Sequence, residues 1–127
     1  MKMNMIFKGI ITIFALSIVV IFGFLLSKNG KPYNDVLFTI HKVVALAMII
    51  YSYLYIKQYT SIIRNDFWLV LFLIIIVICI LALFVTGALL SIGKVDYVLL
   101  KRLHLPIALL MSVSAISFVV VFLKKIA

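Results

Sequence analysis

Four long apolar stretches, separated by short polar linkers, account for nearly the whole chain of 127 residues. They run over about Ile6–Leu26, Val36–Ile56, Phe67–Leu90 and Val98–Leu123. A helix that crosses the hydrocarbon of a bilayer needs about 20 consecutive, mostly apolar residues. Each stretch meets that length, so the pattern predicts an all-α fold. We expect one integral membrane domain over residues 1–127, built as a four-transmembrane-helix bundle.

Polar residues in the linkers indicate where the helices begin and end. Gly30 and Pro32 in the first linker are helix-breaking residues. Asp35 is expected to cap the second span, because a carboxylate accepts hydrogen bonds from free N–H groups at a helix start. The second linker ends in Asn65-Asp66, which is cap-like for the same reason.

Pro106 lies inside the fourth apolar stretch. A proline has no N–H to bond the carbonyl of Arg102, and its ring crowds that carbonyl. Two outcomes follow for the last helix. It either continues with a kink at His104, or it begins only near Leu105, with 98–104 forming an interfacial turn.

The second half of the chain repeats the first, over about 6–56 and about 67–123. Gly23-Phe-Leu-Leu-Ser matches Gly87-Ala-Leu-Leu-Ser, at an offset of 64 residues. The pattern that starts at His41 recurs from His104, at an offset of 63 residues. The repeat predicts two helical hairpins of like direction, related by a pseudo-two-fold axis along the membrane normal.

Composition supports a membrane protein. Hydrophobic residues make up 68% of the chain, whereas soluble domains are about half apolar, so we expect a multi-pass protein of a cell membrane. The net charge of +9 lies mostly at helix ends, which favours contact with anionic lipid headgroups over nucleic acid. Basic residues are divided equally between the two expected faces. If some basic residues on the face of the first and third linkers serve a bound anion, they do not count as orientation signals. We then expect both termini in the cytoplasm.

The only two histidines of the chain are expected at one depth. His41 and His104 each lie about six residues inside a helix, which is roughly 9 Å at 1.5 Å per residue. Gly23 and Gly87 lie roughly 6 Å from the same face by the same count. One layer therefore holds two histidines and two glycines from four different helices.

This layer suits haem, because a low-spin b-type iron takes two axial imidazoles. The glycines leave space between helices, and no C-x-x-C-H motif is present, so one haem b would be held non-covalently. Small and soft side chains follow each histidine at i+4 and i+7, and cations nearby could pair with the propionates. These further candidates are Ala45, Ala108, Met48, Met111, Lys101, Lys31 and Lys94.

Other roles for the histidines stay open at this stage. Duplication copies a packing histidine as readily as a ligand. Zinc or copper wants three or four ligands, and no acidic residue lies in the layer. The single cysteine, Cys79, belongs nearer the middle of the third span. The alternative function is a non-redox membrane assembly subunit or a small transporter component.

The pattern of His41, Thr86-Gly87-x-Leu-Leu and Leu103-His104 resembles the four-helix membrane cytochromes b. These small electron-transfer proteins occur beside bacterial reductases, hydrogenases and flavinylated proteins. The resemblance implies haem b with His41 and His104 as axial ligands, in a bacterial cytoplasmic membrane. It also implies single-electron exchange with a quinone and a flavoprotein or other redox partner, as an electron carrier or reductase subunit rather than a stand-alone enzyme.

The chain departs from this family in one respect. Many members carry four histidines and two haems, one near each membrane face, whereas this chain has two histidines. A single haem near one face cannot carry electrons across the whole membrane. Transmembrane transfer would need a quinone, another subunit or a second copy of the chain, as in a homodimer.

Overall fold

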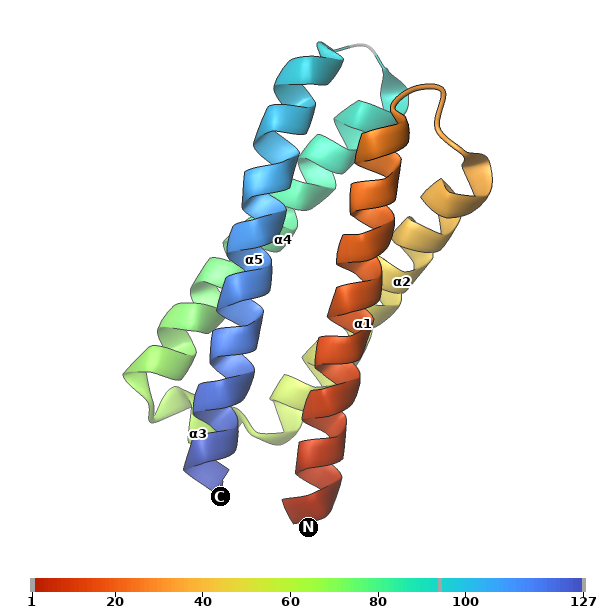
Figure 1. The fold of residues 1–127 in the computed structure, drawn as a ribbon. Helices are drawn as coiled ribbons and strands as arrows, with labels where there is room; N and C mark the ends of the chain where they lie inside the picture. Colours follow the sequence, from red (N-terminus) through yellow and green to blue (C-terminus); the bar gives the residue numbers. More distant parts are fainter. Residues whose placement is uncertain (1, 94, 127) are drawn as a thin grey trace. The chain divides into compact units, whose positions relative to one another are not determined.

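The computed structural model describes residues 2–93 and 95–126, and over these residues it contains helices and no strands (Figure 1). The helices are α1 (Lys2–Asn29), α2 (Asp35–Gln58), α3 (Thr60–Arg64), α4 (Phe67–Ile92) and α5 (Tyr97–Ile126). All except the five-residue α3 are long and apolar enough to cross a membrane. The all-α class and its four spanning helices are therefore confirmed.

The start of α2 corrects one prediction. Asn34, not Asp35, is the capping residue: its side chain accepts a hydrogen bond of 3.0 Å from the N–H of Leu37. Asn34 has the extended backbone of a capping residue (φ −67°, ψ 115°). Asp35 is the first helical residue, where its charge faces the positive end of the helix dipole.

The start of α4 agrees with the prediction. Asp66 has extended backbone and its side chain accepts a hydrogen bond of 3.0 Å from the N–H of Leu69. At the other end of α4, Gly93 adopts a left-handed conformation with φ 73°, and its N–H bonds the carbonyl of Leu89. A glycine tolerates this conformation without steric cost, so it terminates the helix.

Helix α5 runs from Tyr97 to Ile126 with Pro106 inside it. A start near Leu105 is therefore wrong, and 98–104 is helical. Asp96 caps the first turn of α5: its carboxylate accepts a 2.9 Å hydrogen bond from the N–H of Leu99. Membrane helices tolerate an internal proline where neighbouring groups satisfy the freed carbonyl. His104 consequently lies inside the helix, as the depth argument requires.

The linker after α2 holds the short helix α3, which the sequence pattern did not predict. Helix α2 ends at Gln58, and Tyr59 follows as its C-terminal cap. The Thr60 hydroxyl donates a 3.0 Å hydrogen bond to the carbonyl of Lys57. This contact allows the chain to start a new helical turn at once.

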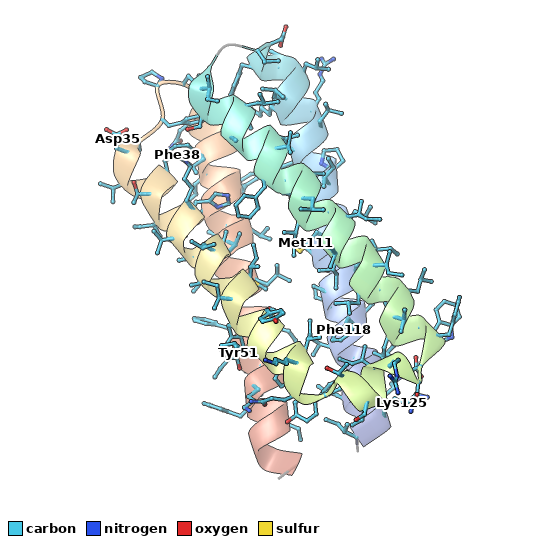
Figure 2. The ribbon with its side chains drawn as sticks, turned by 180° about the vertical axis from the view of Figure 1, so that it is seen from behind. Asp35, Phe38, Tyr51, Met111, Phe118 and Lys125 are labelled. Atoms are coloured by element: carbon cyan, nitrogen blue, oxygen red, sulfur yellow. The ribbon has the colours of Figure 1, made fainter. Side chains whose placement is uncertain are left out.

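The chain divides into two compact units, one up to Ile63 and the other over Arg64–Lys125. The division falls where one sequence repeat gives way to the next. In the first unit α1 and α2 pack against each other. Figure 2 shows Asp35 and Phe38 at the start of α2 and Tyr51 farther along the same helix. The single domain and the pseudo-two-fold axis stay predictions.

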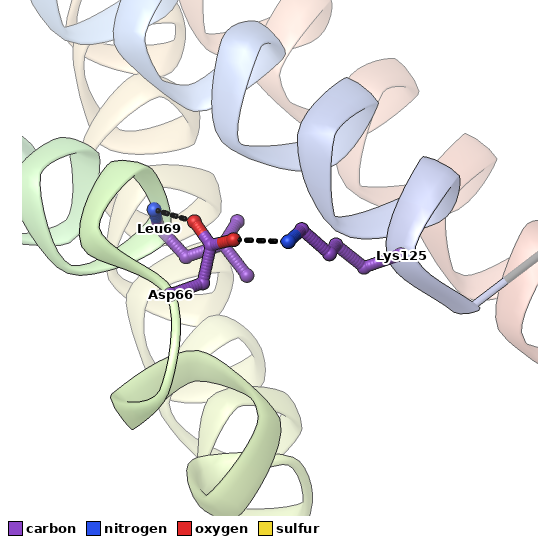
Figure 3. A network of polar contacts seen from close by, with 3 residues as sticks. All are labelled: Asp66, Leu69 and Lys125. Carbon is purple, nitrogen blue, oxygen red and sulfur yellow. Dashed lines mark hydrogen bonds and ion pairs between the residues drawn. The ribbon is translucent and has the colours of Figure 1, made fainter.

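In the second unit, polar contacts join α4 to α5 near both ends of the hairpin. At one end, Nζ of Lys125 lies 2.6 Å from Oδ2 of Asp66 (Figure 3). At the other end, Oγ1 of Thr86 lies 2.7 Å from Nδ1 of His104. Two contacts so far apart along the helices fix the register of the hairpin.

Many large apolar side chains point outward, which is unfavourable in water and favourable in lipid. Helices suit this environment because all their backbone groups are bonded internally. The aromatic residues near the α2–α4 linker are among the exposed ones, as expected of side chains at a membrane–water interface. Their exposed fractions are 63% for Tyr53, 72% for Phe67 and 58% for Trp68. We conclude that the protein is a multi-pass membrane protein.

Candidate functional site

His41 of α2 bonds to the backbone of α1. Its Nδ1 lies 3.0 Å from the carbonyl oxygen of Val19. A carbonyl oxygen can only accept, so the imidazole must donate, and Nδ1 carries the proton. In the neutral ring Nε2 then carries the lone pair, which is the form in which histidine binds metals.

Gly23 makes this hydrogen bond accessible. In an α-helix the carbonyl of Val19 already accepts from the N–H of Gly23, four residues on, and keeps a second lone pair. A helical side chain covers the turn that precedes it, so a residue without one leaves that lone pair open. A Cβ built on Gly23 would lie 3.0 Å from Cε1 of His41. The imidazole thus occupies the space that the glycine vacates.

His104 of α5 bonds to α4 through a side chain instead. Its Nδ1 lies 2.7 Å from the hydroxyl oxygen of Thr86, which is buried. The same hydroxyl lies 2.8 Å from the carbonyl of Ala82 and 3.3 Å from that of Leu83. The second histidine is therefore linked to the helix backbone through a hydroxyl.

The direction of the bonds around Thr86 follows from its single proton. Donation to the carbonyl of Ala82 leaves a lone pair on Oγ1, which accepts from an Nδ1–H of His104. Donation to His104 would leave two acceptor oxygens 2.8 Å apart with no proton between them. The first arrangement satisfies every group, so His104 also carries its proton on Nδ1 and its lone pair on Nε2.

Both repeats hold their imidazole through Nδ1, but the acceptor is a carbonyl in the first repeat and a hydroxyl in the second. At the offset of 64 residues that relates the glycines, Thr86 corresponds to Phe22 and Leu83 corresponds to Val19. The second hairpin thus inserts a hydroxyl where the first uses the carbonyl directly. The space between the glycine and the imidazole is also wider in the second hairpin. A Cβ on Gly87 would lie 3.6 Å from Cε1 of His104, an ordinary contact distance.

These contacts define the chemistry of the candidate site. Each unit offers one imidazole whose Nδ1–H is held by an oxygen acceptor. Metal-binding histidines almost always have such an acceptor on the nitrogen that does not bind the metal, since it fixes the tautomer and the orientation. Among the described residues, no three His, Cys, Asp or Glu side chains come together. Each unit thus contributes one imidazole, the kind of ligand that a haem iron takes.

The apolar candidates keep the spacing that the sequence predicted. In the first unit Ala45 and Met48 follow His41 in α2, and all three are half-buried. In the second unit Ala108 and Met111 follow His104 in α5 and are half-buried as well. Figure 2 shows Met111 between the two ends of α5. Their contact with a porphyrin edge stays a prediction.

The predicted propionate partners lie near aromatic rings. Nζ of Lys101 lies 5.8 Å from the ring centroid of Tyr97, one turn earlier in α5. Nζ of Lys31 lies 5.9 Å from the ring centroid of Tyr33. Lys94 lies outside the described residues. Lys101 is half-buried and Lys31 is exposed; the pairing of either with a propionate stays a prediction.

Two groups that bond the histidines were not predicted from the sequence. The carbonyl of Val19 belongs to the backbone, so no residue type indicates it. Thr86 did carry a signal: a hydroxyl inside an apolar span, directly before a repeated glycine, where the first repeat has Phe22. That difference from the repeat marks Thr86 as unusual, and the structure identifies it as the partner of His104.

Comparison of the chain with protein-family models, with curated proteins and with solved structures finds no match in any of the three. The function is therefore inferred from the residues of the chain itself.

Proposed function

We propose that the chain is a membrane b-type cytochrome that binds one haem b non-covalently, with His41 and His104 as axial ligands. The observation that carries the proposal is that both imidazoles are held in the same way, through Nδ1. Each holds its Nδ1 against an oxygen of its own unit, at 3.0 Å for His41 and 2.7 Å for His104. Each ring therefore has its lone pair on Nε2, the nitrogen that would bind iron.

The surroundings of the histidines support an apolar cofactor rather than a hydrated ion. Both histidines lie in helices that can span a membrane, and small or soft residues follow each of them at i+4 and i+7. A bare metal ion would need further polar ligands to offset its charge. A porphyrin brings four nitrogen ligands of its own, so two imidazoles complete its set.

Haem b, once bound, supplies an iron centre that takes up or releases one electron at a time. The two imidazoles would hold the haem, the apolar residues that follow them would keep water from the ring edge, and Lys101, Lys31 or Lys94 would pair with the anionic propionates. Two imidazole ligands leave no place at the iron for a substrate. The proposed activity is therefore electron transfer and not catalysis at the metal.

The proposed electron route links a quinone or other membrane carrier to a redox protein at the face nearest the histidines. One redox group close to one face reaches a partner on that side of the membrane only. A bacterial cytoplasmic membrane, and a flavoprotein as partner, come from the resemblance to the four-helix membrane cytochromes b.

Haem binding is tested by expression with haem supplied, purification in detergent and a dithionite-reduced-minus-oxidised spectrum. We expect the sharp bands of low-spin haem b at one haem per chain. His41→Ala and His104→Ala should each abolish these bands. The repeat-related variants Leu46→Ala and Leu109→Ala, on exposed side chains of the same helices, should keep them. A colourless wild-type protein overturns the proposal and favours the non-redox alternative.

The redox partner is tested separately on the haem-loaded protein. Mixing the oxidised protein with a short-chain quinol in a stopped-flow instrument should give the reduced spectrum. Reduction by dithionite but not by quinol would exclude the quinone as donor and leave a protein partner. His104→Ala, which lacks the haem bands, controls for absorbance changes of the quinol itself.

A further inference from the structure

The strongest difference between the two repeats lies in how each imidazole is held. His41 bonds directly to a helix carbonyl at 3.0 Å. His104 bonds to the Thr86 hydroxyl at 2.7 Å, and that hydroxyl bonds the carbonyl of Ala82 at 2.8 Å. A direct bond uses a backbone group that every residue type supplies. The second bond depends on a side chain that a single substitution can remove.

We infer that Thr86 is the positioning residue of His104, which holds the proton on Nδ1 and presents Nε2 to the metal. The role of Thr86 toward the imidazole stands on the structure, and its consequence for the haem rests on the proposed function. Without the hydroxyl, Nδ1–H of His104 would lose the acceptor that lies 2.7 Å from it. A buried donor without an acceptor is costly, so the ring would turn or exchange its tautomer.

The environment of Thr86 supports this role over a purely local one. Threonine hydroxyls in helices commonly bond a carbonyl of the preceding turn, and Thr12 does so with Lys8 at 3.0 Å. Thr86 makes that bond and a second one, to an imidazole on another helix. It is also 8% exposed, so water does not easily replace its oxygen as acceptor.

An effect on the iron follows from the same geometry. An oxygen that accepts from Nδ1–H increases the electron density that Nε2 donates to a metal. Loss of this acceptor weakens donation to ferric iron more than to ferrous iron, because the ferric ion carries the higher charge. Removal of the hydroxyl should therefore raise the reduction potential.

The test uses the full chain, labelled with ¹⁵N-histidine, in detergent, in the reduced state if haem is bound. Reduced low-spin haem is diamagnetic, so the Nδ1 proton of His104 can be observed with or without the cofactor. In Thr86→Val this proton should shift upfield. It should exchange with deuterium roughly five- to thirtyfold faster, the factor for loss of one hydrogen bond. Thr86→Ala, which adds no bulk, should give the same result.

Two matched variants complete the design. Thr86→Ser keeps the hydroxyl, and Thr12→Val makes the same change at a threonine whose hydroxyl bonds the carbonyl of Lys8 in its own helix; both should resemble the wild type. In haem-loaded protein, Thr86→Val should also raise the reduction potential, with haem content kept. An unchanged Nδ1 proton in Thr86→Val and Thr86→Ala overturns the inference. A colourless protein overturns the proposed function alone, because the proton measurement does not need haem.

Discussion

The imidazole of His41 lies so close to the backbone of Gly23 that a Cβ on this residue would crowd the ring. A Cβ on Gly23 would lie 3.0 Å from Cε1 of His41, tighter than nine in ten natural contacts of a Cβ. The equivalent distance from Gly87 to His104 is 3.6 Å. Both glycines were expected to make room for a porphyrin, which stays a prediction; the structure places an imidazole directly against Gly23.

This difference predicts unequal effects of one substitution at the two glycines. Gly23→Ala should push the imidazole of His41 by a few tenths of an ångström and weaken its bond to Val19. Crowding of this kind costs about 1–3 kcal/mol. Gly87→Ala has space for its Cβ, so the higher helix propensity of alanine offsets most of any cost. The measurement is the haem-to-protein ratio together with the unfolding midpoint.

Equal loss of haem in both alanine variants would contradict this prediction, because it would mean that the glycines act on the cofactor and not on the imidazoles. Gly9→Ala serves as a third variant, since Gly9 lies in the same helix as Gly23, several turns away from His41.

The start of α2 gives a second prediction. Asn34→Ala removes the side chain that accepts from the N–H of Leu37 at 3.0 Å. Loss of such a cap costs about 1 kcal/mol. Asp35→Ala removes only a charge near the helix start, worth about 0.3–1 kcal/mol. Unfolding titrations in mixed micelles should therefore rank Asn34→Ala as the less stable variant, with Asn34→Asp close to the wild type.

The spans were predictable from sequence because length and apolar character alone determine which segments can cross a bilayer. Their exact ends were not. Asn34 and Asp35 are both good capping residues, and only the backbone angles decide between them. Pro106 was ambiguous for a related reason: whether a helix continues through a proline depends on the groups around the freed carbonyl, which the local sequence does not specify.

The candidate site was predictable only in its side chains. The repeat brought out both histidines and both glycines, since each recurs at the same place. The acceptor of His41 is a backbone carbonyl and leaves no trace in residue type. The pairing of His104 with Thr86 appears in the sequence only as a departure from the repeat, and its meaning depends on the packing of α4 against α5.

A third prediction concerns Tyr51 in α2. Its hydroxyl is buried and has no hydrogen-bond partner among the described residues. A buried polar group without a partner costs about 1–3 kcal/mol. Tyr51→Phe should leave the free energy of unfolding unchanged or raise it by about 1 kcal/mol. Tyr53→Phe changes a side chain that is 63% exposed and should have no measurable effect. A clear loss of stability in Tyr51→Phe would show that the hydroxyl binds another molecule.

The ion pair of Asp66 and Lys125 gives a prediction about acid. The Lys125 ammonium at 2.6 Å, with the Leu69 N–H as the second cause, lowers the pKa of Asp66 below its ordinary value of 3.8. A lowered pKa in the folded state means that the carboxylate stabilises the fold above pH 3.8. This stabilisation is lost as the pH falls through the lowered value.

Substitution isolates this contribution, because the chain has three acidic residues in all. Asp66→Asn keeps an acceptor for the N–H of Leu69 but loses the charge that pairs with Lys125. It should be less stable than the wild type at about pH 6, and this difference should shrink as the pH falls below 3.8 and through the lowered pKa of Asp66. The Asp35→Asn, Asp96→Asn double variant keeps Asp66 as the only acidic side chain, so the acid sensitivity that this variant retains is assigned to Asp66. Thermal unfolding followed by circular dichroism across this range makes the comparison.

Parallel curves for the wild type and Asp66→Asn would mean that the pair with Lys125 does not stabilise the hairpin of α4 and α5. Lys125→Met should behave as an intermediate case, because the bond from Leu69 still favours the charged carboxylate.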